Sequence, residues 1–392
     1  MSIDRFDFGQ MSEGDLSELV VGQVPEGLRI DYKRDLYGNS DADKREVLKD
    51  ISGFANAFGG HLIIGIEEQN GLPVSIPGVA GENPDEVVLR LEQIARTGLE
   101  PRVQGLRVLA IPLSSGSYCF VIRIPRSWHP PHRVTAQNSN RFWIRNSGGT
   151  HEASVDELRT LFTMGADAQH RVFQFREERL SEISNSQSDR PLHGDGRLIL
   201  HIVPLAAVTS SLQIDLEKAL QLHQAFWPIG SSGMSPRFNL EGFINERGGD
   251  SNIGYTQIFR NGIIEATKAS IVSTFEGKKY IPSRIEKQIF DVLHKYINGL
   301  RDLRVPPPLL VLFTLDGVRG AAYKVSSNMC DDPEPGIERD VVFLPECIIN
   351  EYGETIEYHR AVKPAFDALW NTAGRSSAQS FTADGLWKGV PP

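Results

Sequence analysis

The stretch 26–68 constrains the fold of this chain more than any other. Residues 28–33 alternate apolar and polar side chains, and this period of two predicts a strand with one buried face. From residue 43 to residue 58, apolar side chains recur at steps of three and four, which predicts a core-facing helix closed by a Gly-Gly pair. The nearly all-apolar segment 61–66 follows as a buried strand. The sequence therefore predicts a strand–helix–strand unit.

Beyond this stretch, the pattern divides the 392 residues into two α+β domains. The first is a mixed sheet with helices over residues 1–165. A helical connector and linker at 166–196 leads to a second α+β domain at 197–373, in which no chemical signature stands out. The tail, 374–392, is rich in Ser, Ala, Gly and Pro and is predicted to be disordered. Two separate helices are predicted around the first boundary, at 154–162 and 169–185.

The composition is that of a globular protein, with 40% hydrophobic and 23% charged residues. No apolar run reaches the roughly 18 residues that span a bilayer, and no signal peptide is visible. The three cysteines lie far apart, which fits a reducing compartment and argues against a cysteine-based zinc site. We therefore predict a cytoplasmic protein with no membrane partner. The net charge of −9 disfavours wholesale non-specific nucleic-acid binding but allows a local basic groove.

Carboxylates lie near the start of the first predicted strand and at the end of the second. Asp31 and Lys33 share one face of the first strand, Glu26 precedes it, and Glu68 follows the second strand. If the strands are neighbours, the three carboxylates could form an oxygen pocket that suits Mg²⁺ or Mn²⁺, with Lys33 beside a phosphate oxygen. The alternative is that the charges form a solvated face and Lys33 a surface ion pair. Spacing alone leaves both interpretations open.

A second group of residues interleaves arginines with aromatic side chains between 126 and 145. Cations that meet phosphates and rings that stack on bases are typical of a nucleic-acid surface. The alternative is that Trp128 and Trp143 pack in the core and that the arginines are solvated. Together with the basic residues near the first strand, the candidate nucleic-acid contacts are Arg29, Lys33, Arg34, Arg126, Arg133, Arg141 and Arg145.

Three motifs follow one another in the first domain. They are Glu26-x4-Asp31-Tyr32-Lys33, Phe54-Ala55-Asn56-Ala57-Phe58-Gly59-Gly60 and Gly65-Ile66-Glu67-Glu68. This order resembles the Schlafen AlbA_2 domain family. The later segment 141–162 is similar to the closing strand, polar turn and helix of the same family. The resemblance covers residues 20–165.

The resemblance implies a nucleic-acid-binding domain in a bacterial-type, cytoplasmic protein. In the eukaryotic members it implies a metal-dependent endoribonuclease that acts on tRNA and rRNA, so RNA is favoured over DNA. By motif position, Glu26, Asp31 and Glu68 would be the catalytic and metal-binding acids, and Lys33 the catalytic basic neighbour. The second acid is Asp where the family has Glu, and the third is Glu where the family has Asp. Each swap moves a carboxylate by one carbon–carbon bond.

The eukaryotic enzymes pair two such lobes in one chain, whereas one is visible here. We therefore expect a homodimer. One alternative is a non-catalytic regulator or scaffold that binds DNA or RNA. A further alternative is an ATP-binding protein, although the sequence has neither a helix-turn-helix nor a phosphate-binding loop motif.

Overall fold

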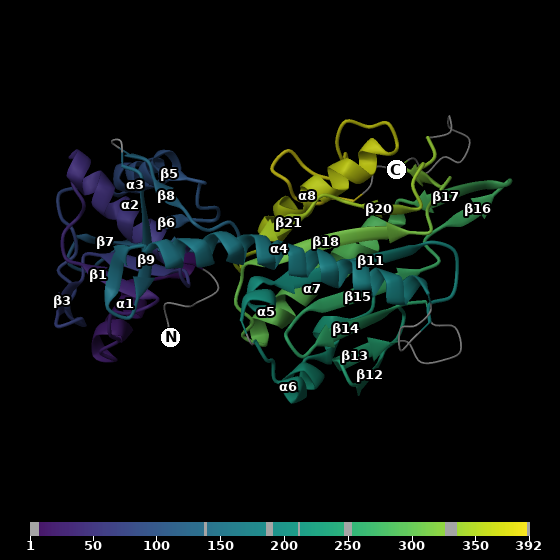
Figure 1. Cartoon of the computed structure of the whole chain (residues 1–392), viewed down its shortest axis with the longest axis horizontal. Helices are drawn as coiled ribbons and strands as arrows, with labels where there is room; N and C mark the ends of the chain where they lie inside the picture. The colour runs from purple at the N-terminus through teal and green to yellow at the C-terminus, as the bar shows by residue number, and fades with distance from the viewer. Residues whose placement is uncertain are drawn as a thin grey trace. The chain divides into compact units, whose positions relative to one another are not determined.

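The computed structural model describes residues 8–136, 139–185, 191–210, 212–246, 253–325 and 335–389. The chain divides into two compact units, unit 1 (Met1–Gln169) and unit 2 (His170–Pro392). Each unit combines helices with β-sheets (Figure 1), which confirms the predicted α+β class. Across the described ranges, no helix is both long and apolar enough to cross a membrane.

Unit 1 contains the predicted strand–helix–strand unit as its first sheet elements. Its helices before the boundary are η2 (Phe8–Gln10), α1 (Glu13–Val21), α2 (Asp41–Ala55) and α3 (Pro84–Gly98). Its strands are β1 (Ile30–Lys33), β2 (Gly60–Ile64), β3 (Glu67–Gln69), β4 (Leu72–Ser75), β5 (Leu99–Glu100), β6 (Arg107–Pro112), β7 (Tyr118–Ile124), β8 (Arg133–Val134), β9 (Arg141–Asn146) and β10 (Gly149–Glu152).

The main sheet of unit 1 has the order β1-β2-β7-β6, and a second sheet has the order β10-β9-β8-β5. Strands β1 and β2 are parallel, as expected for a crossover through a helix, and Asp31 lies opposite Leu62. Leu62 and Ile64 pack on one face of the sheet with α2 and α3. Ile63 packs on the other face with α1. Burial on both faces explains why β2 is almost entirely apolar.

Two glycines set the start of β2. Helix α2 ends at Ala55, three residues before the predicted end at 58, and the chain turns through Gly59, whose φ is +67°. A Cβ atom on Gly59 would lie 2.6 Å from the backbone nitrogen of Arg126. A Cβ atom on Gly60 would lie 2.4 Å from the carbonyl oxygen of Arg29. Glycine is therefore required because other backbone segments of unit 1 approach this turn closely.

One long helix crosses the boundary between the units. The helices predicted at 154–162 and 169–185 are a single helix, α4 (Val155–Ser184). The prediction of two helices was wrong because the intervening residues favour helix, apart from Gly165. A single interior glycine costs only about 1 kcal/mol, too little to end a helix that packs along its length.

Unit 2 is built on an eight-stranded sheet whose path runs β12-β13-β14-β15-β11-β18-β20, with β21 also paired to β18. A small sheet, β16-β17-β19, stands beside it. The helices that follow α4 are α5 (Leu205–Thr209), α6 (Leu216–Gln221), η4 (His223–Phe226), α7 (Arg284–Asp302) and α8 (Thr355–Asn371). The strands are β11 (Arg197–Pro204), β12 (Ser235–Phe238), β13 (Gly242–Glu246), β14 (Tyr255–Phe259), β15 (Ile264–Ala269), β16 (Ser273–Phe275), β17 (Lys278–Pro282), β18 (Leu309–Asp316), β19 (Ala322–Lys324), β20 (Val341–Phe343) and β21 (Cys347–Ile349).

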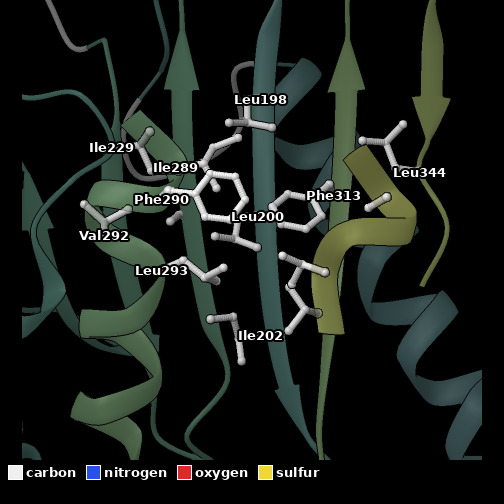
Figure 2. Close-up of a cluster of buried hydrophobic side chains, with 14 of the residues drawn as sticks. Leu198, Leu200, Ile202, Ile229, Ile289, Phe290, Val292, Leu293, Phe313 and Leu344 are labelled. Carbon is white, nitrogen blue, oxygen red and sulfur yellow. The ribbon is translucent and has the colours of Figure 1, made fainter. Parts of the chain in front are cut away.

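The core of unit 2 lies between the large sheet and the helices α7 and α8. Figure 2 shows Leu200 of β11 and Phe313 of β18 facing Phe290 and Leu293 of α7. The side chain of Arg179 on α4 donates to both oxygens of buried Glu265 on β15, at 2.9 and 2.8 Å. This buried pair fixes the second half of α4 to the sheet.

The C-terminal segment differs from its prediction. Residues 374–389 are described and packed, whereas the sequence predicts a disordered tail from 374. The indole of Trp387 stacks on Phe290 with ring centroids 4.8 Å apart, and its Nε1 donates to buried Glu286 at 3.0 Å. Phe381 is buried in the same core. Low sequence complexity misled the prediction because a few aromatic side chains suffice to order the segment. Residues 390–392 lie outside the described residues.

Candidate functional site

Asp31 is the centre of a buried charge cluster in unit 1. The alternation of β1 turns Ile30 and Tyr32 toward the core beside α1, so Asp31 and Lys33 occupy the opposite face. Asp31 is 4% exposed. Its Oδ2 accepts a hydrogen bond from Arg145 Nη1 at 3.0 Å, and its Oδ1 accepts one from Lys33 Nζ at 3.2 Å. Two cations therefore balance one carboxylate.

Glu26 lies against Asp31 and competes with it for a proton. Its Oε1 accepts a hydrogen bond from the backbone nitrogen of Tyr32 at 2.8 Å. Burial, the hydrogen bond with Asp31 and the charges of Asp31 and Glu68 raise the pKa of Glu26 to about 7. Burial also opposes ionisation of Asp31, but the hydrogen bond with Glu26 and the charges of Lys33 and Arg145 outweigh it, so the pKa of Asp31 is lowered. The two carboxyl groups therefore titrate in different pH ranges.

Lys33 is held by a second carboxylate that the sequence analysis missed. Its Nζ lies 3.9 Å from Oδ2 of Asp50 on α2. Asp50 is buried and accepts a hydrogen bond from the hydroxyl of Tyr37 at 2.7 Å. Burial lowers the pKa of Lys33, but the charges of Asp50 and Asp31 outweigh burial and raise it. A carboxylate on the buried face of a helix is the signal that could have revealed Asp50.

Arg145 has a structural position, which corrects its prediction as a nucleic-acid contact. The side chain is 5% exposed and lies over the ring of Phe54, with Cζ 4.4 Å from the ring centroid. Besides the bond to Asp31, its Nε donates to the carbonyl oxygen of Gly27 at 2.7 Å, and its Nη2 donates to that of Ile30 at 3.2 Å. Its donors are therefore used inside the domain.

Glu68 differs from the other two predicted acids in its exposure. It is exposed, and its Oε2 accepts a hydrogen bond from the backbone nitrogen of Gly71 at 2.6 Å. The negative charge of Glu68 helps to raise the pKa of Glu26. The carboxylates of Glu68, Glu26 and Asp31 are nevertheless not arranged to bind one metal ion together. In the described ranges, no group of three or more His, Cys, Asp or Glu side chains is arranged to hold a metal ion. The three carboxylates as placed do not fit the predicted Mg²⁺ or Mn²⁺ site.

Three of the remaining predicted cations already face a carboxylate. Arg34 lies 3.7 Å from Glu67, and Arg141 lies 3.3 Å from Glu152. Arg133 forms an ion pair with Glu100. Such exposed pairs contribute about 0–1 kcal/mol to stability, and each reduces the local positive potential.

Arg29 and Arg126 are different, because neither forms an ion pair with a carboxylate in the part of the chain that is described. Arg29 is exposed and Arg126 is half-buried. Trp128 is buried, and Trp143 packs against the core of unit 1. The alternative that both tryptophans pack in the core, stated in the sequence analysis, therefore holds. The ring of Trp143 also lies 5.6 Å from Lys49 Nζ.

These features lie inside one recognisable domain. Residues 26–154 match the model of the family described as Schlafen, AlbA_2. This chain carries a Schlafen AlbA_2 domain. The resemblance drawn from the three motifs is thereby confirmed. The AlbA_2 domain indicates a function related to nucleic acid.

Two solved structures are similar to part of the chain. The crystal structure of the DIP2311 protein from Corynebacterium diphtheriae shares 16% identity at a TM-score of 0.24, over 36% of this chain and 27% of that chain. The solution structure of the N-terminal domain of a RecG-related protein from Nitrosomonas europaea shares 22% identity at a TM-score of 0.27, over 37% of this chain and 95% of that one. The chain thus spans only 27% of the DIP2311 chain. No curated protein matches the sequence.

Proposed function

We propose that the AlbA_2 domain binds RNA, with structured RNA such as tRNA as its ligand. One observation carries the proposal: Arg29 and Arg126 are cations of the domain that no carboxylate of the described residues neutralises. Because the whole chain has a net charge of −9, phosphate attraction depends on such a local site. RNA is preferred to DNA because the eukaryotic Schlafen enzymes, which the domain resembles, act on tRNA and rRNA.

The test uses the full chain with fluorescein-labelled tRNA and with a labelled DNA duplex of similar length. At low salt, fluorescence polarisation is expected to rise with protein concentration for tRNA and to show weaker binding for DNA. Equal affinity for the two would remove the RNA preference. No binding to either would overturn the proposed function.

A second function, cleavage of the bound RNA, is favoured by the opposed pKa values of Glu26 and Asp31. A carboxyl group with a pKa of about 7 can take a proton from an attacking hydroxyl at neutral pH. The ammonium group of Lys33 would stabilise negative charge that develops on a phosphate oxygen. No step of this proposal passes through a metal ion, because Glu68 does not join the other two acids.

Cleavage is tested by incubating tRNA with the wild-type chain, Glu26→Gln and Glu68→Gln. If Glu26 is the base, Glu26→Gln abolishes the fragments and Glu68→Gln retains them. If both variants are inactive and a chelator stops the wild type, the three acids act together around Mg²⁺ or Mn²⁺. Intact tRNA with every protein leaves binding as the function.

A homodimer is part of the same proposal, since the eukaryotic enzymes build their groove from two lobes. Light scattering after size-exclusion chromatography measures the mass directly. Twice the mass of the 43.6 kDa chain supports a groove built by two copies. The monomer mass would mean that one lobe binds RNA alone.

A further inference from the structure

The Gly59-Gly60 turn brings two arginines together at one end of the main sheet in unit 1. The backbone of Arg126 approaches Gly59, and the backbone of Arg29 approaches Gly60, as the 2.6 and 2.4 Å spacings above require. The carbonyl oxygen of Arg29 accepts a hydrogen bond from the backbone nitrogen of His61 at 2.8 Å. The backbones of the two arginines therefore lie against the same glycine turn.

A third arginine and a neutral histidine lie close to Arg29. Arg123 Nε donates to Nε2 of the buried His61 at 2.9 Å, so this imidazole nitrogen is an acceptor and the ring is neutral. Burial and the charges of Arg123 and Arg29 lower the pKa of His61 to about 3. Burial and the charge of Arg29 likewise lower the pKa of Arg126. The neutral ring of His61 therefore adds no negative charge beside Arg29.

Arg126 is incompletely satisfied by the protein. In the described ranges, its Nη2 donates only to the sulfur of Met164, at 3.5 Å. Its Nε is buried and has no hydrogen-bond partner among the described residues. A half-buried guanidinium without a counter-ion is costly, and an anion would offset that cost.

An exposed aromatic ring completes the arrangement. Phe58 is 47% exposed, although it lies only three residues after Ala55, the buried last residue of α2. The Cζ atom of Arg126 lies over this ring, 5.8 Å from its centroid. A ring held by a cation on one side presents a flat apolar surface to solvent.

We propose that Arg29, Phe58 and Arg126 form a subsite for one unpaired nucleotide of the bound RNA. The two guanidinium groups take the phosphate, and the base stacks on Phe58. The subsite rests on the proposed RNA-binding function and deepens it, because it selects RNA with single-stranded loops or ends over perfect duplex. An unpaired base is required because a base inside a duplex cannot reach an aromatic side chain.

The experiment compares a labelled RNA hairpin that carries a single-stranded 3′ tail with the same hairpin lacking the tail. The full chain is tested as wild type, Arg29→Gln, Arg126→Gln and Phe58→Ala. Two matched controls come from α4: Arg159→Gln, an exposed arginine paired with Asp156, and Phe162→Ala, whose ring is 58% exposed. Arg29→Gln serves as a second arginine variant because Arg29 is exposed and its loss leaves the packing intact.

The wild type is expected to prefer the tailed hairpin. Phe58→Ala is expected to lower affinity for the tailed RNA by about tenfold with an unchanged salt dependence, since stacking carries no charge. Each arginine variant is expected to weaken binding and to reduce the slope of log K against log salt by about 0.7. If the three variants bind like the two controls, the subsite is wrong although RNA binding stands. If the wild type binds neither hairpin, both the proposed subsite and the proposed RNA-binding function are wrong.

Discussion

Nη1 of Arg145 lies 3.0 Å from Oδ2 of Asp31, and both side chains are buried in unit 1. This pair joins β9 to β1, two strands of different sheets. Arg145 therefore helps to hold Asp31, which Lys33 also contacts. The position of Asp31, a residue of the first motif, thus depends in part on an arginine more than one hundred residues away in the sequence.

Breaking this pair should destabilise unit 1 strongly. Arg145→Met removes the buried cation from Asp31 and leaves Lys33 as its remaining cation, and the expected loss in unfolding free energy is about 3–5 kcal/mol. Arg141→Met on the same strand removes an exposed arginine and should cost less than about 1 kcal/mol. Urea denaturation, followed by intrinsic tryptophan fluorescence, measures both. Equal losses for the two variants would mean that the buried pair contributes no special stability.

Ionisation of Glu26 should lower the stability of the folded chain as pH rises from 4.5 to 7, whereas buried His61, whose pKa is lowered to about 3 from 6.5, acts in the opposite sense. In this window the folded chain keeps a proton on Glu26, whose pKa is raised to about 7 from 4.5, while the unfolded chain has lost it. At Glu26 the folded state binds the extra proton, so the contribution of Glu26 to the slope of unfolding free energy against pH is negative there. Asp31 acts in the opposite sense but only at lower pH, because its pKa is lowered from 3.8.

Glu26→Gln removes this titrating group, so the unfolding free energy of the wild type minus that of Glu26→Gln should fall as pH rises from 4.5 to 7. Glu68→Gln is the matched control and should leave the slope unchanged. Denaturation midpoints at several pH values between 4.5 and 7 measure the pH dependence of stability for the wild type and the two variants. A curve for Glu26→Gln as steep as that of the wild type would show that another group is responsible.

Adding one methyl group at Gly59 should damage both stability and RNA binding. The new Cβ of Gly59→Ala would meet the backbone nitrogen of Arg126 at 2.6 Å, in a backbone conformation with a φ of +67°. Gly81→Ala is the control, because Gly81 has a φ of +79° but no atom within 4 Å of the new Cβ. The control therefore carries the conformational cost of about 1 kcal/mol without displacing Arg126. Thermal melts and RNA affinity measured together separate the two effects, and identical results for both variants would remove the role assigned to the close approach.

The ordered C-terminal segment predicts a measurable contribution from Trp387. Trp387→Ala removes the stacking on Phe290 and the hydrogen bond to Glu286, and the expected loss is about 2–4 kcal/mol. Leu386→Ala changes the exposed neighbouring residue and should cost less than about 0.5 kcal/mol. Differential scanning calorimetry should show the shift in the transition of unit 2. An unchanged melting curve for Trp387→Ala would contradict the packed position of the segment.

The sequence alone predicts the parts of the fold that depend on local periodicity. Alternation in β1, helical spacing in α2 and the apolar run of β2 place Asp31 and Lys33 on one strand face. Pairings between distant segments leave no local signal. Arg145 looks like an exposed arginine on an alternating strand, and only the packing of β9 against α2 buries it. Asp50 lies within a helix whose apolar spacing is complete without it. The sequence pattern therefore gives no sign that its carboxylate is buried.

The most direct test of RNA binding is the affinity of the full chain for labelled tRNA at a series of salt concentrations. The account predicts that the wild type binds at low salt and that log K falls linearly with log salt. For the double variant Arg29→Gln/Arg126→Gln, it predicts weaker binding and a slope shallower by about 1.4, or about 0.7 for each lost phosphate contact. Absence of binding at low salt, or a double variant with the affinity and slope of the wild type, would contradict it.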